Sequence, residues 1–177
     1  MTSQNDCDPS TQRPSSRRDF VTAVTVAAAA SAAVSGSAQA QAGTNVRHSN
    51  PSGMSQPTGY SQLVEINGPH RLVFVAGQTG TDAGGKPAKG FRAQMMQAYA
   101  NIRAALASVG GNMNDVVRLT TYITDIEQNA DVYREVRAAT FTDKSRLPAS
   151  TLVQVVRLAE PAYLVEVDAI AILPPRA

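Results

Sequence analysis

Cysteine, histidine and tryptophan are scarce in this chain, and neither sign of charge dominates it. The 177 residues include one cysteine, two histidines and no tryptophan. A single cysteine excludes an internal disulfide and a cysteine-based zinc site, and two histidines give little basis for another metal centre. The net charge of +2 does not favour binding to nucleic acid or to an anionic membrane surface. We therefore predict no metal site and no nucleic-acid partner, and the length suits one ordinary domain.

The first 42 residues differ in composition from the rest of the chain. Arg17 and Arg18 precede an uncharged, alanine-rich stretch over residues 21–34, and small-x-small patterns follow before Gln41 and Gly43. This arrangement resembles a bacterial twin-arginine signal peptide, which predicts export to the periplasm or out of the cell and cleavage at one of those two sites. The alternative is an uncleaved anchor, although 14 weakly apolar residues fall short of the roughly 20 that span a bilayer. Cleavage would remove Cys7 and leave no segment for stable membrane insertion.

Residues 43–57 are rich in serine, asparagine, glycine and proline and lack hydrophobic periodicity. We expect a flexible segment there, followed by one domain over residues 58–177. The domain opens with strand-like runs at residues 60–66 and 72–76, and the turn-forming residues between them predict a hairpin. His70 falls in this turn and His48 in the flexible segment, where solvent-exposed histidines are expected.

Two amphipathic helices are predicted in the middle of the domain, and the first ends at Gly110 and Gly111. Residues 116–124 are apolar and β-branched enough for a strand, and Asp125 then stands where the N-cap of the second helix belongs. The second helix ends before Pro148, because the residue ahead of a proline disfavours helical geometry. The expected buried faces are Phe91, Met95, Ala98, Ile102 and Leu106 for the first helix, and Val132, Val136 and Ala139 with Tyr133 alongside for the second.

Strands at residues 151–156 and 164–173 close the chain and complete the order β-β-α-β-α-β-β. This order predicts an α+β fold in which two helices cover one face of a mixed sheet. Both sets of alternating positions over residues 164–173 are mostly apolar, so two faces of the last strand need cover. The second face either packs against another subunit, which would make a homo-oligomer, or stays exposed.

Two carboxylates, Glu166 and Asp168, interrupt one apolar face of the last strand. Each either has a structural partner or holds a water molecule and accepts a proton. Ser150 is either a turn serine or part of a site, and no base stands at a spacing that would make it a nucleophile. Glycine at position 77 lets main chain approach a small ligand, although the loop lacks the pattern of a phosphate-binding loop. Tyr60 either directs its hydroxyl into the same pocket or packs at its rim.

Several short stretches together identify a family. They are residues 59–62, 76–78, 101–102 and 116–125, and finally 147–149 followed by 165–171. In these stretches the chain resembles the Rid family of reactive intermediate deaminases, also called the YjgF family, over residues 58–173. The resemblance implies a chorismate-mutase-like α+β fold, a homotrimer with three pockets at subunit interfaces, and no cofactor.

Members of this family hydrolyse reactive 2-imino or enamino acids to 2-keto acids and ammonia. The resemblance implies catalytic roles for Glu166 and Tyr60. Ser150 stands where the family has an arginine that binds the substrate carboxylate, and Leu152 stands where a cysteine is frequent. The substrate-binding residues expected on this basis are Gly77, Gln78, Ser150, Thr151 and Leu152.

We therefore expect an exported, cofactor-independent hydrolytic deaminase of a reactive imine- or enamine-type small molecule. A serine cannot supply the charged, bidentate donor that an arginine offers to a carboxylate. The substrate therefore differs from the 2-imino acids, or another side chain such as Arg71 or Arg118 replaces the arginine. The alternative function is a catalytically silent, trimeric small-molecule binding protein. A ribonuclease comes third, because the charge gives no support for nucleic-acid binding.

Overall fold

The computed structural model describes residues 43–176, and the signal peptide predicted over residues 1–42 lies outside them. The described part of the chain forms six strands, two helices and two short 3-10 turns. Their bounds are β1 (Asn45–Ser49), β2 (Leu63–Asn67), β3 (Arg71–Thr79), α1 (Phe91–Ser108), η1 (Met113–Asp115), β4 (Val116–Ile123), α2 (Ile126–Thr140), η2 (Lys144–Arg146), β5 (Ala149–Gln154) and β6 (Val165–Leu173).

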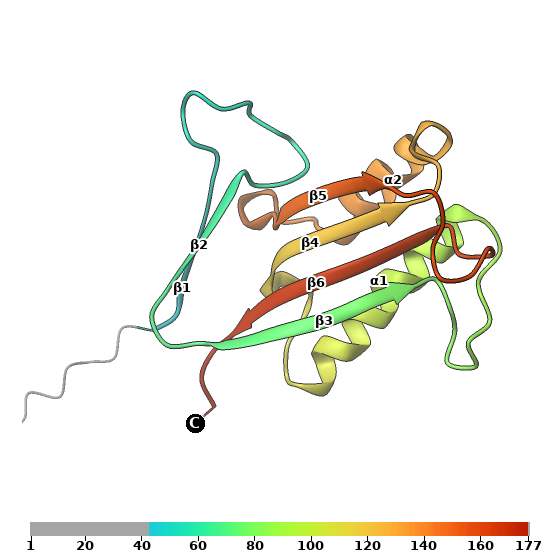
Figure 1. The fold of residues 1–177 in the computed structure, drawn as a ribbon. Helices are drawn as coiled ribbons and strands as arrows, with labels where there is room; N and C mark the ends of the chain where they lie inside the picture. Colours follow the sequence, from blue (N-terminus) through green and yellow to red (C-terminus); the bar gives the residue numbers. More distant parts are fainter. Residues whose placement is uncertain (1–42, 177) are drawn as a thin grey trace, which may run out of the picture. The chain divides into compact units, whose positions relative to one another are not determined.

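Four strands form the main sheet in the order β3-β6-β4-β5 (Figure 1). The strand β6 runs antiparallel to both of its neighbours, whereas β4 and β5 are parallel. Parallel pairing requires a crossover connection, and α2 supplies it between β4 and β5. The sheet is therefore mixed, as predicted, and β3 and β5 form its two edges.

Both helices lie on the same side of the main sheet, behind it in Figure 1. Alternate residues of β6, from Val165 to Leu173, point to that side and are almost completely buried. All the residues predicted for the inner face of α1 are buried, and Met95 and Ile102 have no exposed surface. Tyr99 adds an edge-on contact to Phe141, with ring centroids 5.8 Å apart. The α+β architecture predicted from the sequence is confirmed.

The predicted helix boundaries are also confirmed. Asp125 caps α2, because its side chain accepts a hydrogen bond of 2.9 Å from the N–H of Gln128. Beyond the end of α1, Gly110 adopts a φ of 80°, a conformation that favours glycine, and its N–H donates to the carbonyl of Ala107 at 3.0 Å.

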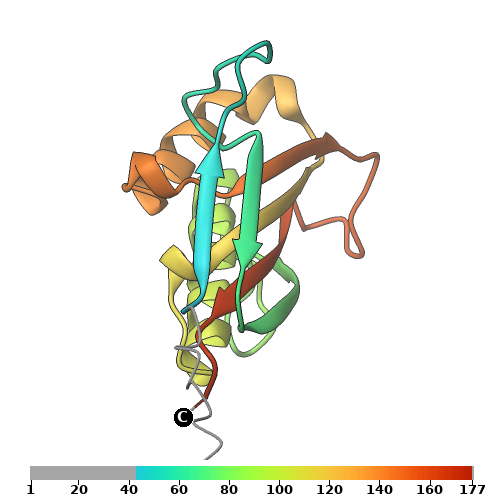
Figure 2. The same ribbon diagram turned by 90° about the vertical axis from the view of Figure 1, so that its left-hand side faces the viewer.

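The N-terminal part of the domain differs from the prediction. Residues 45–49, expected to be flexible, form β1, which pairs antiparallel with β2 as a separate two-stranded sheet (Figure 2). The predicted hairpin is wrong, because β2 pairs with β1 and not with β3. An ion pair of 2.6 Å between Arg47 and Glu65 joins β1 to β2. Polar cross-strand contacts of this kind leave little apolar alternation for a sequence pattern to detect.

The two histidines have different surroundings. His48 was expected in solvent, but it is partly buried, and its Nδ1 atom lies 2.8 Å from the carbonyl oxygen of Leu147. This contact anchors β1 to the segment ahead of β5. His70 is exposed in its turn, as predicted.

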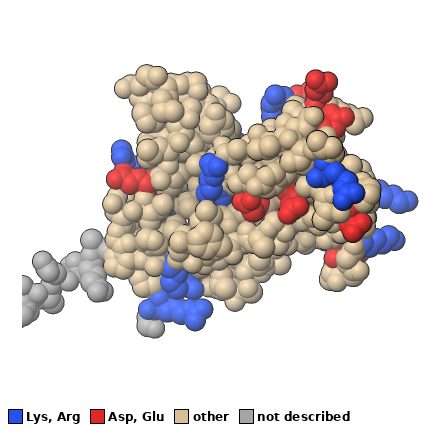
Figure 3. All heavy atoms as spheres, viewed as in Figure 1, with Lys and Arg blue, Asp and Glu red and all other residues tan. Residues whose placement is uncertain are grey.

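The other side of the main sheet is called the open face here. It carries Leu72 and Phe74 from β3, Tyr122 from β4, and Glu166 and Asp168 from β6. Phe74 is 71% exposed and Leu72 is 50% exposed, so large apolar side chains remain in contact with solvent. Acidic and basic side chains lie among the uncharged atoms of this surface (Figure 3). The second apolar face predicted for the last strand thus belongs to a wider apolar surface.

Candidate functional site

The sequence-predicted site residues do not form one cluster within a single chain. Gly77 and Glu166 are in contact at the open face, and Gln78 follows Gly77 in the sequence. Three others lie at a cavity beside α2, namely Tyr60, Ser150 and Leu152. Thr151 alternates with those last two residues along β5, so it faces the opposite side of the sheet.

Glu166 lies directly against the main chain of Gly77. A Cβ atom at position 77 would come within 1.9 Å of the Oε1 atom of Glu166, so only glycine leaves room for this carboxylate. The register between β3 and β6 shifts between Val75 and Gln78, which is where Gly77 lies. The side-chain amide of Gln78 donates to the carbonyl of Ala76 at 3.1 Å. The register shift in β3 thus places an exposed stretch of main chain against the Glu166 carboxylate.

The two carboxylates of the last strand differ in their contacts. Asp168 has a structural partner, because the hydroxyl of Tyr122 donates to its Oδ2 atom at 3.4 Å. Glu166 forms no ion pair with any residue between 43 and 176. Asp168 therefore has a structural partner, and the role of Glu166 stays a prediction.

The two arginines suggested as replacements for the missing family arginine have other contacts. Arg118 donates through Nη2 to the Oγ1 atom of Thr151 at 2.5 Å, and neither residue lines the cavity. Arg71 donates to the carbonyls of Val109 and Pro174, at the end of β3 that is remote from Gly77. Neither arginine therefore joins Tyr60 and Ser150.

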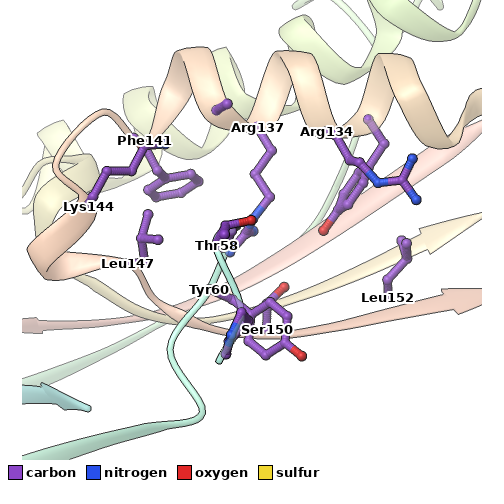
Figure 4. A pocket seen from close by; sticks show the side chains of 13 residues that line it. Thr58, Tyr60, Arg134, Arg137, Phe141, Lys144, Leu147, Ser150 and Leu152 are labelled. Atoms are coloured by element: carbon purple, nitrogen blue, oxygen red, sulfur yellow. Dashed lines mark hydrogen bonds between the residues drawn. The ribbon is translucent and has the colours of Figure 1, made fainter. Parts of the chain in front are cut away.

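A cavity of about 740 Å³ lies between α2 and β5 and is called the α2 cavity here (Figure 4). Its volume is typical of sites for small molecules. Ser61 fixes one wall, because its hydroxyl donates to the carbonyl of Leu147 at 2.7 Å and its N–H donates to that of Pro148 at 3.2 Å. The residues that define the cavity are Tyr60, Tyr133, Arg137, Phe141, Ser150 and Leu152.

Arg137 is a cavity residue that the sequence analysis missed. Its side chain reaches from α2 toward Thr58 in Figure 4, and the residue is only 4% exposed. The Nε atom donates to the carbonyl of Gly59 at 2.9 Å, and the guanidinium carbon lies 5.4 Å from the centroid of the Phe141 ring. Its Nη1 and Nη2 atoms are buried and have no hydrogen-bond partner.

The sequence did contain a signal for this placement. The spacing of four residues from Tyr133 to Arg137 and from Arg137 to Phe141 puts all three on one side of the helix. The apolar pattern instead predicted Ala139 on the buried side, where the structure leaves it exposed. Arg137 turns inward on this helix, where Gly59 offers a carbonyl acceptor.

Ser150 faces the α2 cavity as well. Its Oγ atom is buried without a hydrogen-bond partner, so this hydroxyl does not serve as a turn or capping group. Buried hydroxyls usually have a partner in folded proteins. Ser150 thus lines the cavity, while its hydroxyl lies buried in the wall without a partner.

Residues 43–176 contain neither a group of metal ligands nor a helix that could span a membrane. In that part of the chain, no three histidine, cysteine, aspartate or glutamate side chains come together in a way that could hold a metal ion. None of the helices described there combines the length and apolarity needed to cross a membrane.

Comparison with curated proteins finds relatives of the RutC family and one relative that is named as a deaminase. A RutC family protein from Aquifex aeolicus is 36% identical over 114 residues, which are 64% of this chain and 87% of the relative. A protein named 2-iminobutanoate/2-iminopropanoate deaminase, from Salmonella typhimurium, is 28% identical over 114 residues, which are 64% of this chain and 86% of that protein.

Solved structures agree with the sequence relatives. The structure of YyfB from Yersinia pestis, described as a conserved Rid family protein of unknown function, matches with a TM-score of 0.67 and 31% identity, over 73% of this chain and 99% of that one. RidA from an Antarctic Psychrobacter species matches with a TM-score of 0.54 and 32% identity, over 66% of this chain and 90% of that one. The family model described as Endoribonuclease L-PSP matches residues 52–173. The chain therefore belongs to the Endoribonuclease L-PSP family, which includes the Rid proteins.

Proposed function

We propose that this protein is a hydrolytic deaminase of a reactive imine- or enamine-type small molecule, with Glu166 as its catalytic base. The observation that carries this proposal is the Glu166 carboxylate, which lies against the Gly77 main chain at an accessible sheet face without an ion-pair partner among residues 43–176. The relative named as an imino acid deaminase supports the reaction class.

In this reaction water is the only co-reactant. Glu166 accepts a proton from a water molecule as the water oxygen attacks the carbon of the C=N bond. That proton passes to the imine nitrogen and gives a carbinolamine. The hydroxyl proton of the carbinolamine then moves to its amino group, the C–N bond breaks as the C=O bond forms, and ammonia leaves. The main chain at Gly77 orients the substrate. Glycine has no side chain that would stand between this main chain and the Glu166 carboxylate. No step calls for a cofactor.

We propose a homotrimer as the working form. Tyr60, the second proposed catalytic residue, lines the α2 cavity and does not adjoin Glu166 in its own chain. A second copy on the open face would cover Leu72 and Phe74 and could bring its own Tyr60 to Glu166. The assembly would thus complete the site as well as bury the apolar surface.

We also propose that the protein is exported to the periplasm or beyond by the twin-arginine route. The pair Arg17 and Arg18 ahead of an uncharged stretch supports this location. Replacing both arginines with lysine should keep the protein in the cytoplasm. Unchanged localisation of that variant, measured by cell fractionation, would contradict the proposal.

The catalytic proposal is tested on 2-iminopropanoate and 2-iminobutanoate, generated in place by an amino-acid oxidase with semicarbazide as the competing trap. Wild-type protein should speed the formation of keto acid and ammonia. Glu166→Gln should lower the rate about 100-fold or more, because it removes the base and keeps the side-chain size. Asp168→Asn is the matched control, since it removes a carboxylate from the same strand face but leaves Glu166 in place. Equal rates for wild type and Glu166→Gln would overturn the proposal.

A second candidate function is a binding protein without turnover. It is favoured by Ser150, which stands at the position of the family arginine and whose buried hydroxyl has no partner. Wild-type protein would then release no ammonia, while a ligand would raise its melting temperature. Turnover gained by Ser150→Arg would show that the scaffold remains competent and that position 150 decides between the two functions.

A further inference from the structure

The end of β3 that carries Gly77 has few contacts within the main sheet. β3 is an edge strand, so β6 is its only neighbour among the described strands. The register between the two strands shifts between Val75 and Gln78, and only Gln78 and Thr79 pair with β6 beyond the shift. A glycine-rich stretch over residues 80–90 follows before α1 begins. Strand pairing alone therefore gives little restraint to the main chain at Gly77.

A polar side chain of α1 supplies a second set of contacts to this strand end. The Nδ2 atom of Asn101 donates to the carbonyl oxygen of Thr79 at 3.2 Å and to that of Thr81 at 2.9 Å. The Oδ1 atom of Asn101 accepts from Nε2 of Gln97 at 2.8 Å, and this bond directs the donor end of the amide toward β3. The partly buried Asn101 thus holds the main chain on either side of Gly80.

Gln94, about two helical turns before Asn101, holds the same end of the sheet. Gly80 packs directly on Gln94, because a Cβ atom at position 80 would come within 2.3 Å of the Gln94 Cα atom. The buried amide of Gln94 also accepts from the N–H of Leu164 at 2.8 Å. Leu164 immediately precedes β6, in which Glu166 is the second residue. The start of β6 and the end of β3 are therefore both attached to α1.

Thr79 connects the Asn101 contact to the proposed catalytic base. Thr79 and Glu166 lie opposite each other in the register of β3 and β6. Two residues earlier in β3, the Gly77 main chain lies against the Glu166 carboxylate. A displacement of about 1 Å at a reacting group can lower a rate about 100-fold. The placement of Glu166 against Gly77 therefore depends on how firmly Thr79 is held.

We propose that Asn101 is a positioning residue for the Glu166 site. Its two hydrogen bonds hold β3 at Thr79 and Thr81, and this keeps the Gly77 main chain against the Glu166 carboxylate. Asn101 belongs to α1, on the side of the sheet opposite the open face, so it acts through the strand and does not touch the substrate. This role rests on the proposed function, because Asn101 affects hydrolysis only through Glu166.

The kinetic test compares Asn101→Ala with wild type on 2-iminobutanoate in the semicarbazide assay. Alanine keeps the helix and removes both hydrogen bonds to β3. We expect kcat to fall about tenfold or more while KM changes less than about threefold, because the placement of the base matters mainly in the transition state. Asn101→Asp is a second variant of the same size that also lacks the two N–H donors, and it should lose at least as much. A kcat within about twofold of wild type in either folded variant would overturn the proposal.

Leu106→Ala is the matched control on the same helix. Leu106 has no exposed surface and accepts a hydrogen bond from Gly111, which packs on Leu173 at the far end of β6 from Glu166. This variant should lose more stability than Asn101→Ala, yet its kcat should stay within about twofold of wild type when every protein is assayed fully folded. An equal fall of kcat in the two variants would show a general effect of a loosened fold and would overturn the role of Asn101.

Combination with Glu166→Gln tests whether Asn101 acts through the base. Asn101→Ala should lower the rate of the Glu166→Gln protein less than about twofold, although it lowers the wild-type rate about tenfold, because the base that Asn101 positions is already absent. Equal losses in the two backgrounds would show that Asn101 contributes independently of Glu166, and this result would overturn the proposal.

A measurement without turnover separates this role from the proposed function. Glu166→Gln should shift the NMR signals of the Gly77 and Gln78 amides, because the carboxylate lies against that main chain. In the Asn101→Ala background the same substitution should shift these signals less than about half as far. Undiminished shifts would overturn the positioning role even where hydrolysis is observed. Diminished shifts in a protein without hydrolysis would support the positioning role and contradict the proposed function alone.

Discussion

The two sides of the main sheet carry different kinds of residue and serve different purposes. On the helix side, β4 and β6 contribute Leu119, Ile123 and Val167, which have no exposed surface. On the open face, Phe74 remains 71% exposed, and Glu166 lies against the Gly77 main chain. The helix side therefore provides most of the stability of the single chain, whereas the open face has room for substrate, water or a second subunit.

The first prediction compares one leucine from each side. Leu119→Ala should lower the free energy of unfolding by about 2–5 kcal/mol, because it leaves a cavity in a fully packed core. Leu72→Ala would lower it by less than about 1 kcal/mol in an isolated chain, where half of that side chain is exposed, and by more in the proposed homotrimer, which covers it. Urea denaturation followed by circular dichroism measures both changes.

The same pair of variants tests the proposed assembly. If Leu72→Ala costs as much as Leu119→Ala, the open face is buried in solution. Light scattering should then give the mass of a trimer for the wild type and a smaller mass for a variant with a charge at Phe74. A monomeric wild type would contradict the homotrimer.

The helix side could be predicted from the sequence because its residues repeat with clear periods. Met95 and Ile102 follow the helical period, and Val165 and Val167 follow the strand period, so their burial was predictable. The pairing of β2 was not, because cross-strand contacts such as Arg47 with Glu65 have no periodic signature in one sequence. Periodicity shows which side of an element is buried, but it does not show which strands pair.

The second prediction concerns Gly77, the point where the open face has no spare room. Gly77→Ala would place a Cβ atom within 1.9 Å of Glu166 Oε1, so the carboxylate or the strand must move. We expect a loss of about 1–3 kcal/mol in stability from this overpacking. Deaminase activity should fall with it about tenfold or more, because the proposed base leaves its position.

Gly43→Ala is the control for the second prediction. Nothing lies within 4 Å of a Cβ atom at position 43, so that variant should match the wild type in stability and rate. Activity that survives in Gly77→Ala would show that the contact between Glu166 and the main chain is not needed for turnover.

The candidate site was only partly predictable, for a physical reason. The resemblance named Glu166, Gly77, Tyr60 and Ser150 as site residues, but it did not show that one chain divides them between two sides of the sheet. Arg137 was missed because a charged residue on a helix usually faces solvent. Its burial depends on a tertiary contact, the carbonyl of Gly59, which lies 78 positions away in the sequence.

The third prediction, with the smallest effect, concerns a polar group on the helix side. Tyr99→Phe removes a buried hydroxyl that has no partner, so the stability at neutral pH should change by less than about 1 kcal/mol.

The pH dependence of the stability should change more clearly in this variant. Burial raises the pKa of Tyr99 in the folded protein above its unfolded value of about 10, so its contribution to stability is fully present below that pH. As the pH rises above that unfolded value, the unfolded chain releases this proton first, and the contribution is lost on the way up to the folded pKa. The unfolding free energy of Tyr99→Phe, measured by urea denaturation from neutral pH to about pH 11, should therefore fall less steeply above pH 10 than that of the wild type. Identical slopes in the two proteins would mean that the Tyr99 phenol reaches solvent. The core on the helix side would then be less tightly packed than the contact between Tyr99 and Phe141 indicates.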